Sequence, residues 1–401
     1  MNLVLALALL AAQAAGEVRV YPAEIELSTA RDRQSFVVQA VAPDGVTRDV
    51  TDEVQVVFAA PLAERRGNVL TPLADGKTEM AVTVMGRTIK VPLTVSQAAA
   101  DRPISFKLDV MPVFMRAGCN AGACHGAARG KDGFRLSLFG FDPEGDWHRL
   151  TREMSGRRIS VAVPEECLRV EKAPGGVSHT GGARFKPKSE LHGTILRWLD
   201  AGAPKDAESV ARPVSLELMP PKLVLEGEGS AQRMTVRARY SDGTDRDVTS
   251  LARFMSSNDG SAGIDENGKV TAGKRGEAHV FARFATFTVG AQAIILPKGE
   301  PYVWPKVPEN NYVDGLVFDK LRKLRMIPSE LCSDETFLRR ATLDIVGLVP
   351  SREEFERFAA DASPDKREKL GDELLARKEF SELWVMNWAE LLQNRPNANA
   401  H

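Results

Sequence analysis

The chain has few cysteines, little net charge and no long apolar run after its N-terminus. Four cysteines in 401 residues are too few for the disulfide-dense scaffold of a small secreted domain. The formal net charge is −1, so the composition gives no reason to expect a nucleic-acid partner or an anionic membrane surface. No segment is long and apolar enough to span a bilayer. We therefore expect neither a transmembrane segment nor binding to nucleic acid.

Residues 1–15 have the pattern of a secretory signal peptide. An apolar run ends in Ala12-Gln13-Ala14, a small-residue cleavage site, although the usual basic residue at the start is missing. We expect an exported protein, located in the periplasm or at the cell surface. A chain of 401 residues also exceeds one hydrophobic core and should hold several domains.

The most informative motif is a pair of cysteines followed directly by a histidine, Cys119-Asn-Ala-Gly-Ala-Cys124-His125. In C-x-x-C-H sites each thiol adds to one haem vinyl group, and the histidine becomes the proximal iron ligand. Here the spacer has four residues, most of them small. Three other interpretations remain open, namely a Cys119–Cys124 disulfide, a zinc site and a pair of buried thiols.

Predicted helices flank this motif. One runs into Cys119, and a second begins after Ser189 and ends before Pro204. The loop 172–188, which precedes the second helix, contains no methionine but contains His179. We take His179 as the candidate distal ligand, with Met154 as the alternative. An iron without a second protein ligand also remains open.

Residues 104–205 resemble the planctomycete-type cytochrome c domain of large exported bacterial proteins. The matching segments are Gly118–Gly126, Phe134–Leu138, Gly156–Ile159 and Ser178–Phe185. In that family the long spacer is itself common. The resemblance implies one covalent haem c on Cys119 and Cys124, with His125 as its proximal ligand, and a role in electron transfer.

A repeat lies on both sides of this region. Asp44–Thr51, Asp-Gly-Val-Thr-Arg-Asp-Val-Thr, recurs 198 residues later as Asp242–Thr249, Asp-Gly-Thr-Asp-Arg-Asp-Val-Thr. Apolar residues alternate identically in both copies, which predicts half-buried strands, and Asp-Gly predicts a tight turn. Residues 17–97 and 213–297 resemble group 2 bacterial Ig-like domains. Such domains are usually spacers or adhesion modules, which implies contacts with other proteins or with cell-surface polymer.

Four aspartates of the repeat are possible calcium ligands, but no dense loop of oxygen ligands is visible. These aspartates are Asp44, Asp49, Asp242 and Asp247.

Residues 310–401 change to helical patterns after a proline-rich linker. Helix starts are predicted near Tyr312, Ser333, Ser351, Ser363 and Phe380. Three segments resemble the start of a domain of unknown function that commonly follows such cytochrome domains: Phe337–Pro350, Ser363–Arg367 and Trp384–Leu392. Since relatives continue further, we expect a truncated module.

The expected fold is multidomain, with two Ig-like β-sandwiches bracketing a mostly α, c-type cytochrome-like domain and an all-α C-terminal module. We expect an exported electron carrier with one haem and an unidentified redox partner. Two alternatives are an adhesion protein whose cysteine pair forms a disulfide, and a redox enzyme whose catalytic part is the helical tail or is missing. No residue is assigned a catalytic role, and Glu353, Glu354 and Glu390 are interpreted as solvated.

The remaining cysteines and histidines are interpreted as incidental. A Cys167–Cys332 disulfide is possible but would join two domains. The histidines in this group are His148, His192, His279 and His401.

Overall fold

The structure is a computed structural model that describes residues 16–154 and 158–394. The predicted signal peptide, residues 1–15, lies outside the described residues, as do Gly156, Arg157 and His401. The chain divides into two compact units, with the boundary between Met326 and Ile327. A search of the described ranges finds no helix with the length and apolar character needed to cross a bilayer.

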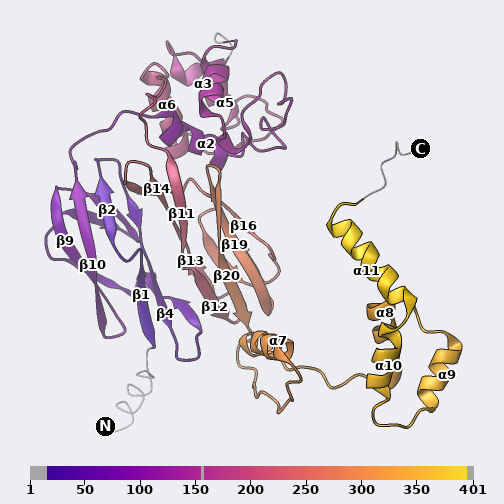
Figure 1. Cartoon of the computed structure of the whole chain (residues 1–401). Coiled ribbons are helices and arrows are strands. Elements are labelled where there is room, and N and C mark those ends of the chain that lie inside the picture. The colour runs from indigo at the N-terminus through magenta and orange to yellow at the C-terminus, as the bar shows by residue number, and fades with distance from the viewer. Residues whose placement is uncertain (1–15, 155–157, 395–401) are drawn as a thin grey trace, which may run out of the picture. The chain divides into compact units, whose positions relative to one another are not determined.

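Ten strands between Glu17 and Ser96 form a first β-sandwich-like body (Figure 1). The sheet orders are β1-β4-β5, β2-β10-β9-β6 and β3-β8-β7, and only β2 and β10 pair in parallel. In β1, Val18 and Val20 are buried while Glu17 and Arg19 are exposed, as the sequence alternation predicts. The strands are β1 (Glu17–Tyr21), β2 (Ile25–Ser28), β3 (Gln34–Ser35), β4 (Val37–Val41), β5 (Thr47–Asp49), β6 (Gln55–Phe58), β7 (Ala63–Arg66), β8 (Val69–Pro72), β9 (Gly76–Val84) and β10 (Arg87–Ser96).

A second body repeats the first strand for strand. β15 follows β5 by 198 residues, whereas β19 follows β9 by 200, so two extra residues lie between β16 and β18. The predicted turn is present in both copies, with Gly45 and Gly243 at a φ of 85°. The strands are β11 (Pro213–Met219), β12 (Lys222–Glu226), β13 (Ala231–Arg233), β14 (Thr235–Tyr240), β15 (Asp245–Asp247), β16 (Arg253–Ser256), β17 (Ala262–Ile264), β18 (Lys269–Ala272), β19 (Gly276–Phe284) and β20 (Phe287–Leu296).

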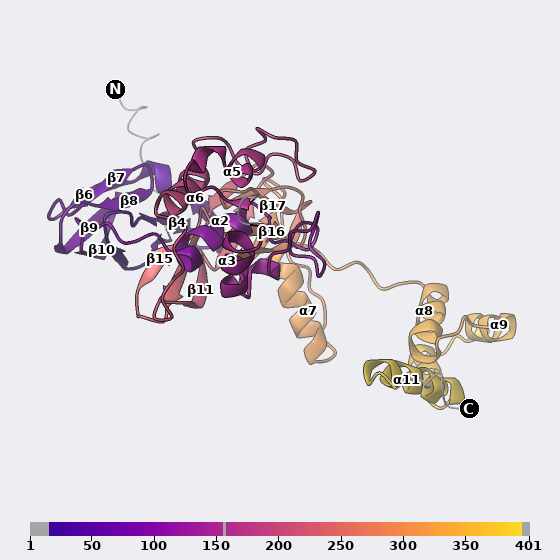
Figure 2. The same ribbon diagram turned by 90° about the horizontal axis from the view of Figure 1, so that it is seen from above.

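The two repeats contact each other reciprocally through the second aspartate of their shared motif. Ser35 N donates a hydrogen bond to Asp247 Oδ2 at 2.6 Å, and Arg233 N donates one to Asp49 Oδ2 at 2.8 Å. Ser35 and Arg233 occupy equivalent positions of the repeat, as do Asp49 and Asp247. Figures 1 and 2 show the two bodies side by side.

A second reciprocal pair of bonds has the same relation. Gln39 Nε2 donates to Lys222 O at 3.2 Å, and Arg237 Nη1 donates to Glu24 O at 3.4 Å. Gln39 and Arg237 are equivalent positions of the repeat, and so are their acceptors, Glu24 and Lys222. Such reciprocal contacts are the pattern of a self-complementary interface between two copies. The repeats therefore pair with approximate two-fold symmetry, and Asp49 and Asp247 serve this pairing.

Substituting Asn for Asp247 is expected to destabilise the paired repeats. The carboxylate accepts from both the backbone N and the Oγ of Ser35, and leaving such donors unsatisfied costs about 1–3 kcal/mol. Calorimetry should show a melting temperature lower by several degrees. Glu228→Gln is the matched control, because Glu228 is exposed and lies outside the interface. Equal melting temperatures for the two variants would contradict this role of Asp247.

Short helices and loops occupy the chain between the two repeats (Figure 1). Their apolar sides share one core in which the rings of Phe106 and Trp198 have centroids 5.2 Å apart. Ser189 caps α6 as predicted, accepting from His192 N. The helices are the π-helix η2 (Phe106–Val110), α2 (Met111–Arg116), η3 (Leu138–Gly140), α3 (Pro143–Thr151), η4 (Pro164–Glu166), α5 (Leu168–Lys172) and α6 (Glu190–Asp200).

Within residues 298–394, which the structure describes, five helices follow the second sandwich. The first, α7, belongs to the first compact unit, and the other four make up the second. Ser333 and Ser351 cap helices as predicted, and Ser351 forms the expected capping box with Glu354. The predicted start at Ser363 is wrong by two residues, because Ser363 N and Oγ bond Asp361 and the helix begins at Lys366. The helices are α7 (Tyr312–Lys323), α8 (Asp334–Val346), α9 (Arg352–Ala360), α10 (Lys366–Leu375) and α11 (Lys378–Leu391).

Candidate cofactor site

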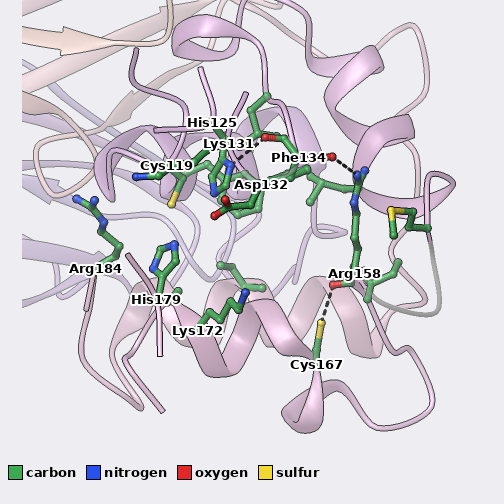
Figure 3. Close-up of a pocket in the computed structure, with 18 of the residues that line it drawn as sticks. Cys119, His125, Lys131, Asp132, Phe134, Arg158, Cys167, Lys172, His179 and Arg184 are labelled. Atoms are coloured by element: carbon green, nitrogen blue, oxygen red, sulfur yellow. Dashed lines mark hydrogen bonds between the residues drawn. The ribbon is translucent and has the colours of Figure 1, made fainter. Parts of the chain in front are cut away.

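A cavity of about 350 Å³ opens among the helices between the repeats (Figure 3). This volume lies in the range of small-molecule sites, about 300–1,000 Å³. One wall carries Cys119 and His125, and the opposite wall carries His179. The apolar lining is Phe114, Phe134, Leu136, Leu150, Ile159, Phe185, Ile195, Trp198 and Leu199.

The cysteine motif folds into successive turns that absorb its long spacer. Cys124 N donates to Ala121 O at 2.9 Å, and His125 N donates to Cys119 O at 2.9 Å. The second bond brings His125 back beside the first cysteine despite the four intervening residues. Gly126 is required by this path, since a Cβ there would lie 2.1 Å from Asn120 O. The spacer therefore does not separate His125 from Cys119.

Hydrogen bonds orient both imidazoles. His125 Nδ1 lies 3.0 Å from Phe134 O, and His179 Nδ1 lies 3.2 Å from Gly182 O. A carbonyl oxygen only accepts, so in each ring Nδ1 carries the proton and the Nε2 lone pair is the one suited to bind a metal. Second partners of this kind are what fix the tautomer and orientation of metal-binding histidines.

The two imidazoles lie across the cavity from each other. The ring centroids of His125 and His179 are 6.5 Å apart, and the ring planes differ by 9°. Two imidazoles on opposite sides of one metal ion, each with a bond of about 2 Å, place their ring centres roughly 6 Å apart. The centroid spacing is thus close to that of two imidazoles sharing one ion, and the two ring planes are nearly parallel.

Cys119 contributes to the cavity lining, and the sulfur of Cys124 is contacted by a basic side chain. Arg184 Nη2 donates to Cys124 Sγ at 3.4 Å, and the backbone of Arg184 is tied to Ala173 O. This contact orients the second sulfur from the same wall that carries His179. Thiols, two facing imidazoles and an apolar lining together fit a covalently attached haem.

Met154, the alternative ligand, lies at the rim of the cavity. It contributes to the lining, but its side chain is 57% exposed. Its position on the rim does not place it opposite His125, whereas His179 does lie there.

Among residues 16–154 and 158–394, no group of three or more His, Cys, Asp or Glu side chains is placed to hold a metal ion.

Two lining residues were not predicted from the sequence as part of the site. Cys167 is buried, and its Sγ donates to Arg158 O at 3.2 Å. The Arg158 guanidinium lies 4.9 Å from the centre of the Phe134 ring, which in turn packs 4.7 Å from the His125 ring. The sequence signal that could have placed Cys167 in the core is its spacing of three residues from Val170, which puts both on one helix face. Both side chains are buried in the structure.

The remaining histidines of the described chain lie outside the cavity lining. His148 and His279 are exposed, and the His192 ring packs 6.3 Å from that of Phe185. Cys332 belongs to the second compact unit, whereas Cys167 belongs to the first, and both are thiols.

A family described as PSCyt2, protein of unknown function (DUF1549), matches residues 312–401. The expected resemblance of the tail to a cytochrome-associated domain of unknown function is thereby confirmed for that part of the chain. A search of curated proteins found no match.

Several solved structures share weak similarity with the chain. Domains 5-6 of the S-layer protein SbsC have 11% identity and a TM-score of 0.28, and cover 70% of this chain and 98% of that one. Domains 4 and 5 of SbsC have 9% identity and a TM-score of 0.19, with coverages of 64% and 89%. The D0-D1 domain of intimin has 9% identity and a TM-score of 0.15, with coverages of 70% and 95%. With TM-scores this low, these similarities carry no argument about function.

Proposed function

We propose that this chain is an exported c-type cytochrome-like protein that binds one haem covalently and transfers single electrons. The observation that carries the proposal is the facing pair of imidazoles, His125 and His179, directly beside the thiol of Cys119. Haem bound there supplies a one-electron iron couple. The Ig-like repeats are proposed to act as spacers that contact other proteins or cell-surface polymer.

Each residue of the site has a distinct part in this proposal. Cys119 and Cys124 would form the two thioethers, and Arg184 contacts the second sulfur. Phe134 O accepts from His125 Nδ1 and Gly182 O accepts from His179 Nδ1, which leaves Nε2 of each ring as the nitrogen that would bind the iron. Two histidine ligands favour a lower potential than a histidine–methionine pair, because a thioether favours the reduced iron.

One wall of the site is apolar and buried. Phe114, Leu136 and Leu150 are buried, and Trp198 closes the wall with its indole nitrogen bonded to Pro204 O at 3.1 Å. Burial of the site raises the cost of adding charge to the metal centre and so tunes its potential. This wall is also the main core of the helical region.

A spectroscopic redox titration tests the proposal. The exported protein, produced together with haem-attachment machinery, is expected to show haem bands that respond to potential as a single one-electron transition. Colourless protein with Cys119 and Cys124 joined in a disulfide would contradict the proposal and favour an exported binding protein.

Substituting Ala for Gly181 is expected to disturb the distal side of the site. A Cβ at this position would lie 2.6 Å from His179 Cε1, so the ring must move. We expect the visible spectrum to change from the six-coordinate, low-spin type towards the high-spin type. Gly193→Ala is the control, because a Cβ there meets nothing within 4 Å. Identical spectra for both variants would remove His179 from the iron.

A further inference from the structure

Several basic side chains line the cavity or lie close to it. Lys131, Lys172 and Arg184 contribute to its lining, and Figure 3 shows them around His125 and His179. Arg253 of β16 lies near Arg184. Both guanidinium groups approach the same side of Gly118, where an added Cβ would be 3.6 Å from Arg253 Nη1 and 3.9 Å from Arg184 Nη1. We call Lys131, Lys172, Arg184 and Arg253 the basic rim. Its charge comes from both the helical region and the second sandwich.

Carboxylates do not neutralise the basic rim. Within the part of the chain that the structure describes, none of its four side chains forms an ion pair. Three other basic residues of the helical region do form ion pairs. Arg149 pairs with Asp146, Arg158 with Glu153 and Lys205 with Glu144. One acidic side chain, Asp132, accompanies the rim in the lining.

The positive charge is local and does not reflect the composition of the whole chain. Residues 104–205 contain 16 Lys or Arg and 11 Asp or Glu, a formal charge of +5 within a chain of net charge −1. Four more basic residues, all exposed, lie close in sequence to the rim. They are Arg129, Arg135, Lys186 and Lys188. An uncompensated charge of one sign around a cleft focuses its field there and attracts ions of opposite sign.

We propose that the basic rim is the docking surface for a redox protein whose own electron-transfer centre is surrounded by acidic side chains. This inference rests on the proposed function and names the class of its partner. One electron passes between the partner's centre and the bound iron, so that one is oxidised as the other is reduced, and no bond forms or breaks. Complementary charge speeds the encounter and orients the two openings towards each other.

Small redox ions of opposite charge test the rim in the loaded protein. Haem content is first established from the visible spectrum. The reduced protein is then oxidised by ferricyanide, an anion, or by hexaammineruthenium(III), a cation, at low and high salt. The double variant Lys131→Glu/Lys172→Glu is compared with the wild type and with Lys205→Glu, which changes a basic residue outside the cavity lining.

At low salt the double variant is expected to react about tenfold more slowly with ferricyanide and faster with the ruthenium complex. Added salt should reduce both differences, and Lys205→Glu should change either rate by less than about twofold. Unchanged rates in the double variant would overturn the docking surface.

Two further results would also overturn the proposal. Loss of haem from the double variant, with normal rates for the loaded fraction, would assign the rim to the haem carboxylates. Colourless wild-type protein would instead refute the proposed function itself. The spectrum separates this failure from the others before any rate is measured.

Discussion

Replacing Cys119 and Cys124 together with serine is expected to abolish covalent haem attachment completely. A thioether requires a sulfur at each vinyl group, and a serine hydroxyl does not form one. Cys167 also lines the cavity but is 2% exposed, with its thiol bonded to Arg158 O, so we do not expect it to substitute. Either single variant should retain one thioether. The measurement is the haem that stays with the chain after extraction with acid acetone.

Cys167→Ser is the matched control for this experiment. It removes a sulfur from the same cavity, while a serine hydroxyl can still donate to Arg158 O. We expect this variant to keep its covalent haem. If the Cys119/Cys124 double variant kept haem through extraction, the attachment site would lie elsewhere in the chain.

Replacing His179 with methionine is expected to raise the midpoint potential. The thioether favours the reduced iron more than imidazole does, and axial ligands shift haem potentials by on the order of 100 mV or more. His179 faces His125 from the opposite wall, so a side chain at this position is placed to reach the same ion. A redox titration of the two proteins provides the comparison.

His192→Met serves as the control for the ligand exchange. His192 lies in the same region, but it packs against Phe185 and is not part of the cavity lining. Its replacement should leave the potential and the spectrum unchanged. An unchanged potential in His179→Met would show that His179 is not an axial ligand.

Local sequence signals predicted the helical caps and the strands of the repeat well. Ser351 and Glu354 form their capping box because both partners lie within four residues. The alternation in β1 placed Val18 and Val20 in the core because strand periodicity needs no knowledge of distant residues. The start of α10 was missed because Ser363 bonds backwards to Asp361, a competing local bond that the Ser-Pro pattern does not reveal.

Long-range contacts could not be predicted from one sequence. The four repeat aspartates were considered only as possible calcium ligands, yet Asp49 and Asp247 accept bonds from the opposite repeat. That role depends on how two complete sandwiches pack. The same limit applies to the cavity, because Arg158 and Cys167 enter its lining through contacts with Phe134 and with each other. His179 was predicted as a ligand only from its position in a loop without methionine.

The most direct test of the proposed function is the mass of the exported wild-type chain after acid-acetone extraction, combined with mapping of its haem peptide. We expect a mass increase equal to one haem, carried by a single peptide that contains Cys119, Cys124 and His125. A chain of unmodified mass, with the two cysteines recovered as a disulfide, would contradict the proposed cytochrome-like function.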